Sequence, residues 1–365
     1  MKRLELLDYG RFFAAISVVL FHYTFNGIAN GKITSISHTP WLIGVTKYGY
    51  LGVEFFFMIS GFVIFFSARN KVASRFIVSR AIRIYPAYWF AVLFTSFFAM
   101  QWGANLMSIY PSQVLANLTM LQSLLGITHI DGVYWTLVYE IQFYFTVFLL
   151  IFFGLQKYLN YIFIFWPIIF FAALAFEIQD LPLMGSYFYY FSAGAIFAVL
   201  KEKFDWRAVF SLFLIYILCL NFSITNVEQS ADSKEVEYSF MVIGLIVTFF
   251  FLLFGYQNTQ KAQLLKLPLS KIAGALTYPV YLIHAHFGYM FISQFATEEN
   301  KVFVYILTIS IVLAVSLLIH KVVEEYFAAV WKGVFGFVLS RPLDYVQALS
   351  ARICSAYSAH KFGRF

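Results

Sequence analysis

An apolar run near the start of the chain contains two polar side chains that are costly to bury in hydrocarbon. Residues 8–23 read DYGRFFAAISVVLFHY, in which Arg11 and His22 interrupt a membrane-like segment. Eleven residues return a helix to within about 20° of its starting face, about 16 Å further along the axis. Asp8 lies within i,i+3 reach of Arg11. This stripe predicts a polar pathway or reactive site inside a helix bundle, or else a snorkelling arginine and a hydrogen-bonded core histidine.

The composition of the whole chain is that of a membrane protein. Hydrophobic residues occupy 61% of its 365 positions and charged residues 12%, about half the share in a soluble domain. The formal charge of +7 therefore records topology and not nucleic-acid binding, because basic residues orient membrane spans. The two cysteines give no disulfide framework and no metal-ligand spacing. We interpret the N-terminal apolar run as a retained span, since Arg11 interrupts it and no small-residue cleavage site follows.

Apolar windows long enough to cross a bilayer recur along the chain. They predict an all-α polytopic membrane protein with about ten transmembrane helices. The sequence shows no convincing internal repeat. The segment 110–126 is apolar but short and broken, so we expect a re-entrant or interfacial piece there. The expected spans are 9–26, 50–68, 82–102, 136–154, 160–177, 186–201, 208–224, 239–256, 272–292 and 303–322.

The distribution of basic residues orients these spans. Of the 25 Lys and Arg residues, 20 fall on one side of the predicted topology when both chain ends are placed in the cytoplasm. Arg11 lies within the membrane, and only Lys32, Lys47, Lys234 and Lys301 fall outside. This asymmetry favours an even number of spans with both termini cytoplasmic. We expect a transmembrane domain over 1–324 and a cytoplasmic amphipathic tail over 325–365.

The topology assigns a depth to each ionisable side chain. His22, Glu54 and Glu140 fall in the outer third of spans 1, 2 and 4. A carboxylate that faces a histidine fixes its tautomer and raises its basicity, as general acid–base catalysis requires. Two alternatives stay open, namely that either glutamate serves only packing, and that Glu54 is solvated at its span end.

Two further segments carry candidate binding groups. Arg80 and Arg83 share a helical face where span 3 begins, which suits a polyanionic phosphate group, although such arginines often only orient a span. In span 9, Tyr281 and His284 share a face, and Pro279 is expected to kink the helix. A mid-membrane histidine is a pathway candidate or a satisfied core residue.

Five segments occur in an order and topology that are specific in combination, although each is weak alone. They are LDYGRFFAAISVVLFHY (with Arg11 and His22), GYLGVEFFFMISGFVIFFSA, RFIVSRAIRIYPAYW (Arg80, Arg83, Tyr85, Pro86), DGVYWTLVYEIQFYF (Trp135, Thr136, Leu137, Glu140, Phe143, Tyr144) and ALTYPVYLIHAH. Together they resemble the acyltransferase-3 family of integral membrane acyltransferases, which includes bacterial surface-polysaccharide O-acetyltransferases. The resemblance covers nearly the whole chain.

The resemblance implies a function and a location. It implies transfer of an acyl group, usually acetyl, from cytosolic acetyl-CoA or a related acyl-CoA donor to a hydroxyl of a surface glycan, such as lipopolysaccharide O-antigen or exopolysaccharide. The glycan acceptor would be free or lipid-linked, and the enzyme would lie in a bacterial inner membrane without a metal. The acceptor sugar and the oligomeric state stay open.

Specific roles follow for the candidate residues. We expect His22 to act as the general base or as a transient acyl carrier, Glu140 to orient it, and Arg11 to guide the donor arm or hold a carboxylate. The expected site comprises catalytic His22, Glu140 and Arg11, donor-binding Arg80, Arg83 and Tyr85, and substrate-binding Trp135, Tyr281 and His284.

A transporter or a flippase of lipid-linked sugars is the alternative function, because a stripe of intramembrane His, Glu and Arg also suits a proton relay. The absence of an inverted or parallel sequence repeat argues against it. A membrane scaffold is a third possibility, and it leaves the Arg11–His22 stripe unexplained.

Overall fold

The computed structural model describes residues 4–69, 71–103, 106–231 and 236–347. Within these ranges the chain is helical and contains no strand, which confirms the all-α prediction. The helices longer than ten residues are α1 (Glu5–Phe21), α4 (Gly52–Arg69), α5 (Ala73–Trp102), α7 (Trp135–Phe152), α8 (Leu159–Ala175), α9 (Phe188–Glu202), α10 (Trp206–Ala231), α11 (Phe240–Gln257), α13 (Ser270–Ile283), α14 (Ala285–Phe295) and α15 (Lys301–Leu318).

Shorter pieces complete the described chain. The short α-helices are α2 (Gly27–Ala29), α3 (Pro40–Thr46), α6 (Pro111–Leu118), α12 (Gln260–Leu264) and α16 (Ala328–Phe335). Short 3₁₀ or π segments are η1 (His22–Asn26), η2 (Lys47–Leu51), η3 (Gln122–Leu125), η4 (Gly132–Tyr134), η5 (Leu155–Tyr158), η6 (Ile319–Tyr326) and η7 (Gly336–Ser340).

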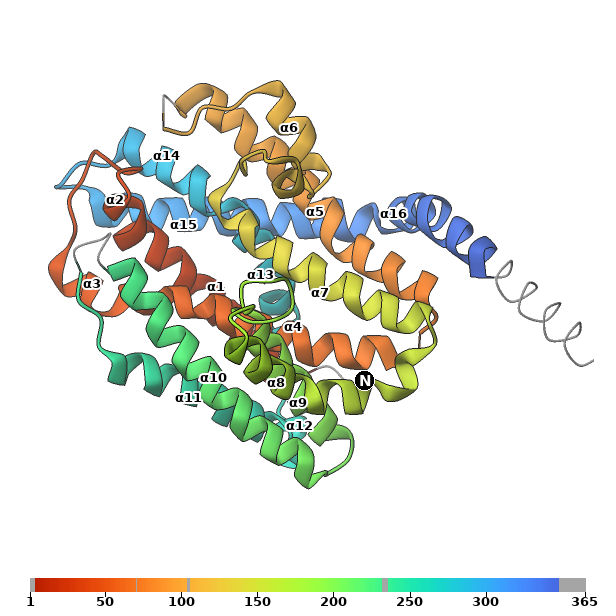
Figure 1. Ribbon diagram of the computed structural model, residues 1–365. Coiled ribbons are helices and arrows are strands. Elements are labelled where there is room, and N and C mark those ends of the chain that lie inside the picture. The colour runs from red at the N-terminus through yellow and green to blue at the C-terminus, as the bar shows by residue number, and fades with distance from the viewer. Residues whose placement is uncertain (1–3, 70, 104–105, 232–235, 348–365) are drawn as a thin grey trace, which may run out of the picture.

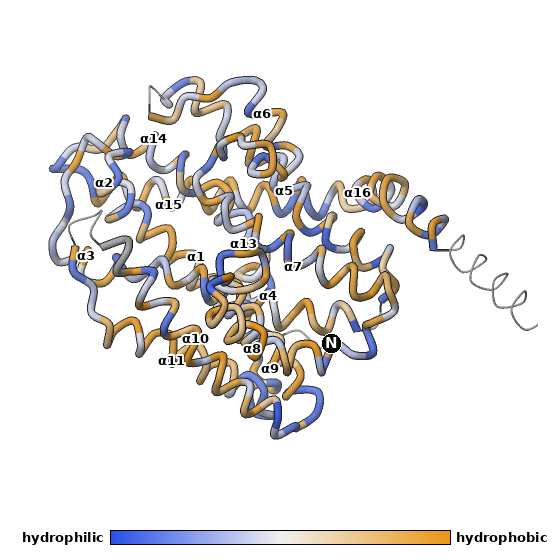
Figure 2. The backbone as a smooth tube through the Cα atoms, viewed as in Figure 1, coloured by the Kyte–Doolittle hydropathy of each residue, from blue (hydrophilic) through white to orange (hydrophobic). Residues whose placement is uncertain are grey.

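Eight helical stretches of the described chain are long and apolar enough to cross a membrane. The other two expected spans are also helical, but one is short and the other is interrupted. The span expected at 186–201 is the 15-residue α9, and the span expected at 272–292 is broken into α13 and α14. Hydrophobic residues occupy the middles of the helices and hydrophilic residues gather in the loops (Figure 2). The count of ten spans and the cytoplasmic position of the ends stay predictions.

The centre of the bundle is the contact between α4 and α9 (Figure 1). Every residue of α9 from Phe188 to Val199 is buried. A Cβ atom on Gly194 would overlap the carbonyl oxygen of Met58, and one on Gly61 would overlap that of Phe191. The two glycines therefore allow the backbones to approach closely, as small residues do between membrane helices.

The segment that follows α5 folds back along that helix. The indole of Trp89 donates to Leu118 O at 2.8 Å, and the hydroxyl of Tyr88 donates to Asn117 O at 2.8 Å. Both aromatic residues lie near the middle of the 30-residue α5. The segment that contains α6 thus reaches half-way along α5, as the re-entrant alternative predicts.

The break between α13 and α14 falls at His284 and not at Pro279, which lies inside α13. A side chain satisfies a backbone group at the break, since the amide N–H of His286 donates to Asp131 at 2.9 Å. The carbonyl oxygen of His284 accepts from Gly288 N–H at 2.9 Å and also from the hydroxyl of Tyr23 at 2.8 Å. Broken membrane helices need such partners, because the surrounding lipid offers none.

The described part of the predicted tail continues from α15 through η6 into α16, which packs against α5. The ring of Trp331 lies 5.9 Å from that of Trp89, and the ring of Phe335 lies 5.9 Å from that of Tyr85. Beyond α16, η7 also packs against α5. Residues 348–365 of the expected tail lie outside the described residues.

Candidate active site

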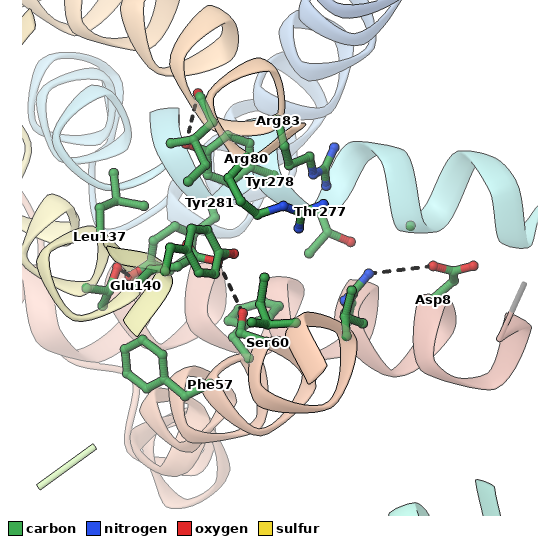
Figure 3. A pocket seen from close by; sticks show the side chains of 18 of the residues that line it. Asp8, Phe57, Ser60, Arg80, Arg83, Leu137, Glu140, Thr277, Tyr278 and Tyr281 are labelled. Atoms are coloured by element: carbon green, nitrogen blue, oxygen red, sulfur yellow. Dashed lines mark hydrogen bonds and ion pairs between the residues drawn. The ribbon is translucent and has the colours of Figure 1, made fainter. Parts of the chain in front are cut away.

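A cavity of about 470 Å³ lies between α1, α4, α5, α7 and α13. Arg80 and Arg83 point into it from the side opposite Ser60 (Figure 3). Its lining combines five charged side chains at one end with aliphatic and aromatic side chains along the walls. The lining includes Asp8, Arg11, Arg80, Arg83, Lys271, Val53, Phe56, Phe57, Ser60, Val63, Ile64, Leu137, Glu140, Tyr144, Tyr278, Thr136 and Tyr281.

The basic end of the cavity consists of Arg11, Arg80, Arg83 and Lys271, and we call it the arginine end. Arg80 and Arg83 share a face of α5, as their i,i+3 spacing predicts. Arg11 lies 3.9 Å from Asp8. Sequence reasoning did not assign Lys271 to the site, because it resembled an ordinary basic residue at the start of a span.

The partners of Arg80 and Arg83 leave both guanidiniums open to a ligand. The guanidinium of Arg80 lies over the ring of Tyr144 at 5.8 Å, and that of Arg83 lies over Tyr278 at 5.6 Å. Arg83 also pairs with Glu324 of η6 at 3.6 Å, and its side chain is 41% exposed. Because a guanidinium has five donors, these contacts leave capacity to bind an anion.

Glu140 lies inside the cavity. Its carboxylate accepts a hydrogen bond from Ser60 at 3.1 Å and another from the hydroxyl of Tyr144. Nearby, the hydroxyl of Tyr281 lies 2.9 Å from that of Thr136 and donates to Val133 O at 3.2 Å. Thr136 and Tyr281 both line the cavity.

Beyond Tyr281 lies a group of polar side chains that we call the histidine cluster: His22, Asn26, His284 and Tyr289. The rings of His22 and His284 lie 5.0 Å apart, edge to face. Nδ1 of His22 contacts the hydroxyl of Tyr289, to which Asn26 also donates at 3.1 Å. The structure thus brings together His22 and His284, which the sequence assigned separately to catalysis and to substrate binding.

The structure gives Glu140 and His22 different neighbours. We expected the carboxylate to face the imidazole from the same depth. Glu140 instead lies in the cavity with Ser60 and Tyr144, whereas the histidine cluster surrounds His22. The expected pairing has no counterpart in these contacts, because the face of α7 that carries Glu140 turns toward α4 and α5.

The carboxylate nearest the histidine cluster belongs to Asp131, which sequence reasoning did not assign. Asp131 is completely buried and accepts from the amides of Val133 and His286 at 3.2 and 2.9 Å. The Nζ atom of Lys32 lies 2.8 Å from Nε2 of His286. Burial lowers the pKa of Lys32, and the charge of Asp131 opposes that shift.

Three other candidates lie outside the cavity lining. Tyr85 donates to Thr119 O at 3.2 Å and packs on the α16 side of α5. The ring of Trp135 packs at a tilt against that of Tyr187, with 4.8 Å between the ring centres. Glu54 is completely buried, and its carboxylate oxygens have no hydrogen-bond partner among the described residues. This burial excludes the solvated position that the sequence left open for Glu54.

A cavity with a cationic end, and a histidine cluster that contacts Tyr281 of its lining, suits an integral membrane enzyme that handles an anionic substrate. Residues 4–321 match the acyltransferase-3 family, described as an acyltransferase domain. The chain therefore belongs to this family of acyltransferases, as the sequence motifs predicted. No curated protein and no solved structure matches it.

Proposed function

We propose that this protein is a membrane O-acyltransferase that moves an acyl group, acetyl in the simplest case, from acyl-CoA to a hydroxyl of a surface glycan. One observation carries the proposal: a single cavity leads from the arginine end to the Thr136–Tyr281 pair, directly behind which lies the histidine cluster. Family membership supplies the reaction class. The donor, the acetyl group and the glycan acceptor belong to the proposal.

The arginine end suits the phosphates of the donor. Guanidiniums bind phosphate through paired, charge-assisted hydrogen bonds, and Lys271 adds a further cation. The walls beyond this end are formed by apolar side chains such as Phe56, Val63 and Ile64. Such walls suit an extended thioester arm, while the nucleotide stays at the arginine end.

The histidine cluster suits the acceptor side of the reaction. A hydroxyl becomes a competent nucleophile when an imidazole takes its proton, a contribution of about 10²–10⁴-fold to the rate. The sequence assigned this role to His22, with an acyl-imidazole as the alternative. The ring of Tyr281, which lines the cavity, lies 5.7 Å from that of His284, so the cluster lies next to the cavity wall.

Reconstituted protein provides the test. Purified protein in liposomes would receive isotope-labelled acetyl-CoA and a glycolipid extract from the host membrane. We expect label in base-labile esters of the glycan, identified by mass spectrometry. Absence of labelled ester, together with proton-coupled uptake of a solute without any donor, would contradict acyl transfer and favour a transporter.

A further inference from the structure

The two imidazoles of the histidine cluster have different hydrogen-bond partners. Nδ1 of His284 lies 2.8 Å from the carbonyl oxygen of Tyr281. A carbonyl only accepts, so this nitrogen carries the proton and Nε2 keeps a lone pair. His284 is completely buried, and its Nε2 has no hydrogen-bond partner among the described residues. A buried acceptor without a partner is rare in folded proteins and calls for an explanation.

His22 has the opposite arrangement. Its Nδ1 faces the hydroxyl of Tyr289 and, at 3.4 Å, the amide nitrogen of Asn26. Asn26 also donates to the hydroxyl oxygen of Tyr289, which leaves the hydroxyl proton for His22. Both neighbours thus donate toward Nδ1, which makes Nδ1 an acceptor and places the ring proton on Nε2.

Asp131 supplies a buried negative charge near His284. Its carboxylate holds the amide of His286 two residues beyond His284 and is buried without exposure to solvent. The titratable side chains near His284 are Tyr23 and His22 of η1, Tyr281 of α13, His286 of α14 and Asp131 before η4. Behind them, Tyr289 contacts His22 and Lys32 contacts His286. Among these, Asp131 is the carboxylate.

We propose that His284, and not His22, is the catalytic base, and that Asp131 is its positioning residue. The proposal rests on the proposed acyl transfer. The proton of the acceptor hydroxyl passes to Nε2 of His284 while the hydroxyl oxygen bonds to the thioester carbonyl carbon. The carbon–sulfur bond then breaks, and the imidazolium returns the proton to the leaving thiolate. His22 donates its Nε2 proton in a hydrogen bond to the carbonyl oxygen as that oxygen gains negative charge.

The dependence of kcat on pH separates the two histidines. A base must be unprotonated, so kcat of the unchanged protein rises with pH along an acidic limb. We expect His284→Asn to lower kcat by about 10²–10⁴-fold and to abolish this limb. We expect His22→Gln to lower kcat by about 10²–10³-fold, because it loses a donor, and to keep the limb.

Two further variants complete the experiment. Asp131→Asn should move the limb to lower pH by roughly half a unit to one unit, because a negative charge near the imidazole is lost. Tyr23→Phe removes another contact that holds the helix break, but no charge, and should leave the limb in place. The matched control is His38→Gln, since His38 also bonds a backbone carbonyl, Phe25 O at 3.1 Å, outside the cluster. The kcat of this control should stay within twofold of the unchanged protein. The acidic limb of its pH profile should not move.

The outcomes are distinct. Loss of the limb in His22→Gln, or its retention in His284→Asn, would overturn the assignment of the base. A stationary limb in Asp131→Asn would overturn the positioning role of Asp131. If His284→Asn does not fold, as judged by thermal unfolding, the profiles of His22→Gln and Asp131→Asn still decide the question. Absence of acyl transfer by the unchanged protein would contradict the proposed function itself, and with it this proposal.

Discussion

The arginine end and the histidine cluster differ in how firmly the structure holds their side chains. At the arginine end the ion pairs are long, 3.9 Å for Arg11–Asp8 and 3.6 Å for Arg83–Glu324, and the side chains of both arginines are partly exposed. In the histidine cluster His284 is completely buried, and hydrogen bonds of 2.8 Å hold its ring and its carbonyl oxygen. On the proposed function, the first region would adapt to a flexible anionic donor, and the second would fix the direction of the proton transfer.

Changes in the histidine cluster should therefore act mainly on kcat. His22→Ala should lower kcat by about 10²–10³-fold, because it removes the imidazole that the proposal makes a hydrogen-bond donor to the reacting carbonyl oxygen. The KM for acetyl-CoA should stay within about threefold, since the proposal places the donor phosphates at the arginine end. Steady-state acyl transfer by purified protein measures both constants. A folded variant with near-normal turnover would remove His22 from the mechanism.

Changes at the arginine end should act mainly on donor binding. Arg80→Ala should raise the KM for acetyl-CoA by roughly tenfold, as expected for one charge-assisted phosphate contact of about 1.5 kcal/mol. Arg83→Ala should have a smaller effect, because Glu324 already shares that guanidinium. Arg75→Ala on the exposed side of α5 is the matched control. An unchanged KM with a depressed kcat would contradict the division between the two regions.

The Thr136–Tyr281 pair separates the two regions and has an effect of its own. Tyr281→Phe keeps the ring but loses the hydroxyl that lies 2.9 Å from Thr136. We expect hydrolysis of acetyl-CoA without acceptor to rise by a few-fold, since one such hydrogen bond contributes about 1 kcal/mol. Release of free thiol in the absence of glycolipid measures this leak. Hydrolysis equal to that of the unchanged protein would show that the pair does not restrict the path.

The smallest effect concerns the loop that carries Lys32 above the histidine cluster. Lys301 and Ser37 hydrogen-bond the carboxylate of Glu298 and lower its pKa from 4.5 to about 2. The folded state stabilises the ionised carboxylate of Glu298 relative to the unfolded state. This contribution to stability is therefore present above about pH 4.5 and is lost as the pH falls toward 2.

Glu298→Gln tests this contribution by thermal unfolding across pH. The variant should be slightly less stable than the unchanged protein at pH 7, and the two should converge near pH 2. Its kcat at neutral pH should stay within twofold. A difference in melting temperature that does not change with pH would exclude the carboxylate as its source.

The sequence predicted the helical class, the family and the stripe from Arg11 to His22, because these depend on periodicity and on the cost of charge in hydrocarbon. It also predicted the shared face of Arg80 and Arg83. It did not reveal Asp131 or Tyr289, since their contacts join residues more than 150 positions apart. The pairing of Glu140 with His22 was inferred from depth alone, and depth does not say which way a side chain turns around its helix.

The position of the helix break shows the same limit. Pro279 was the visible signal for a kink, yet the helix continues through it. The break at His284 depends on Asp131 and Tyr23, which lie on other elements. The local sequence pattern therefore predicted an irregularity in this helix. Contacts with other elements determine that the break falls at His284.

The close contact of α4 and α9 has a consequence for how the protein is made. A helix of 15 residues rises about 22 Å, less than the hydrocarbon thickness of about 30 Å. During biosynthesis α9 alone is thus too short to insert stably into the bilayer. Its insertion therefore depends on packing against helices that were inserted before it. A larger residue at Gly194 should consequently appear as a defect in membrane integration, detected as degraded or misinserted protein, before any catalytic defect can be measured.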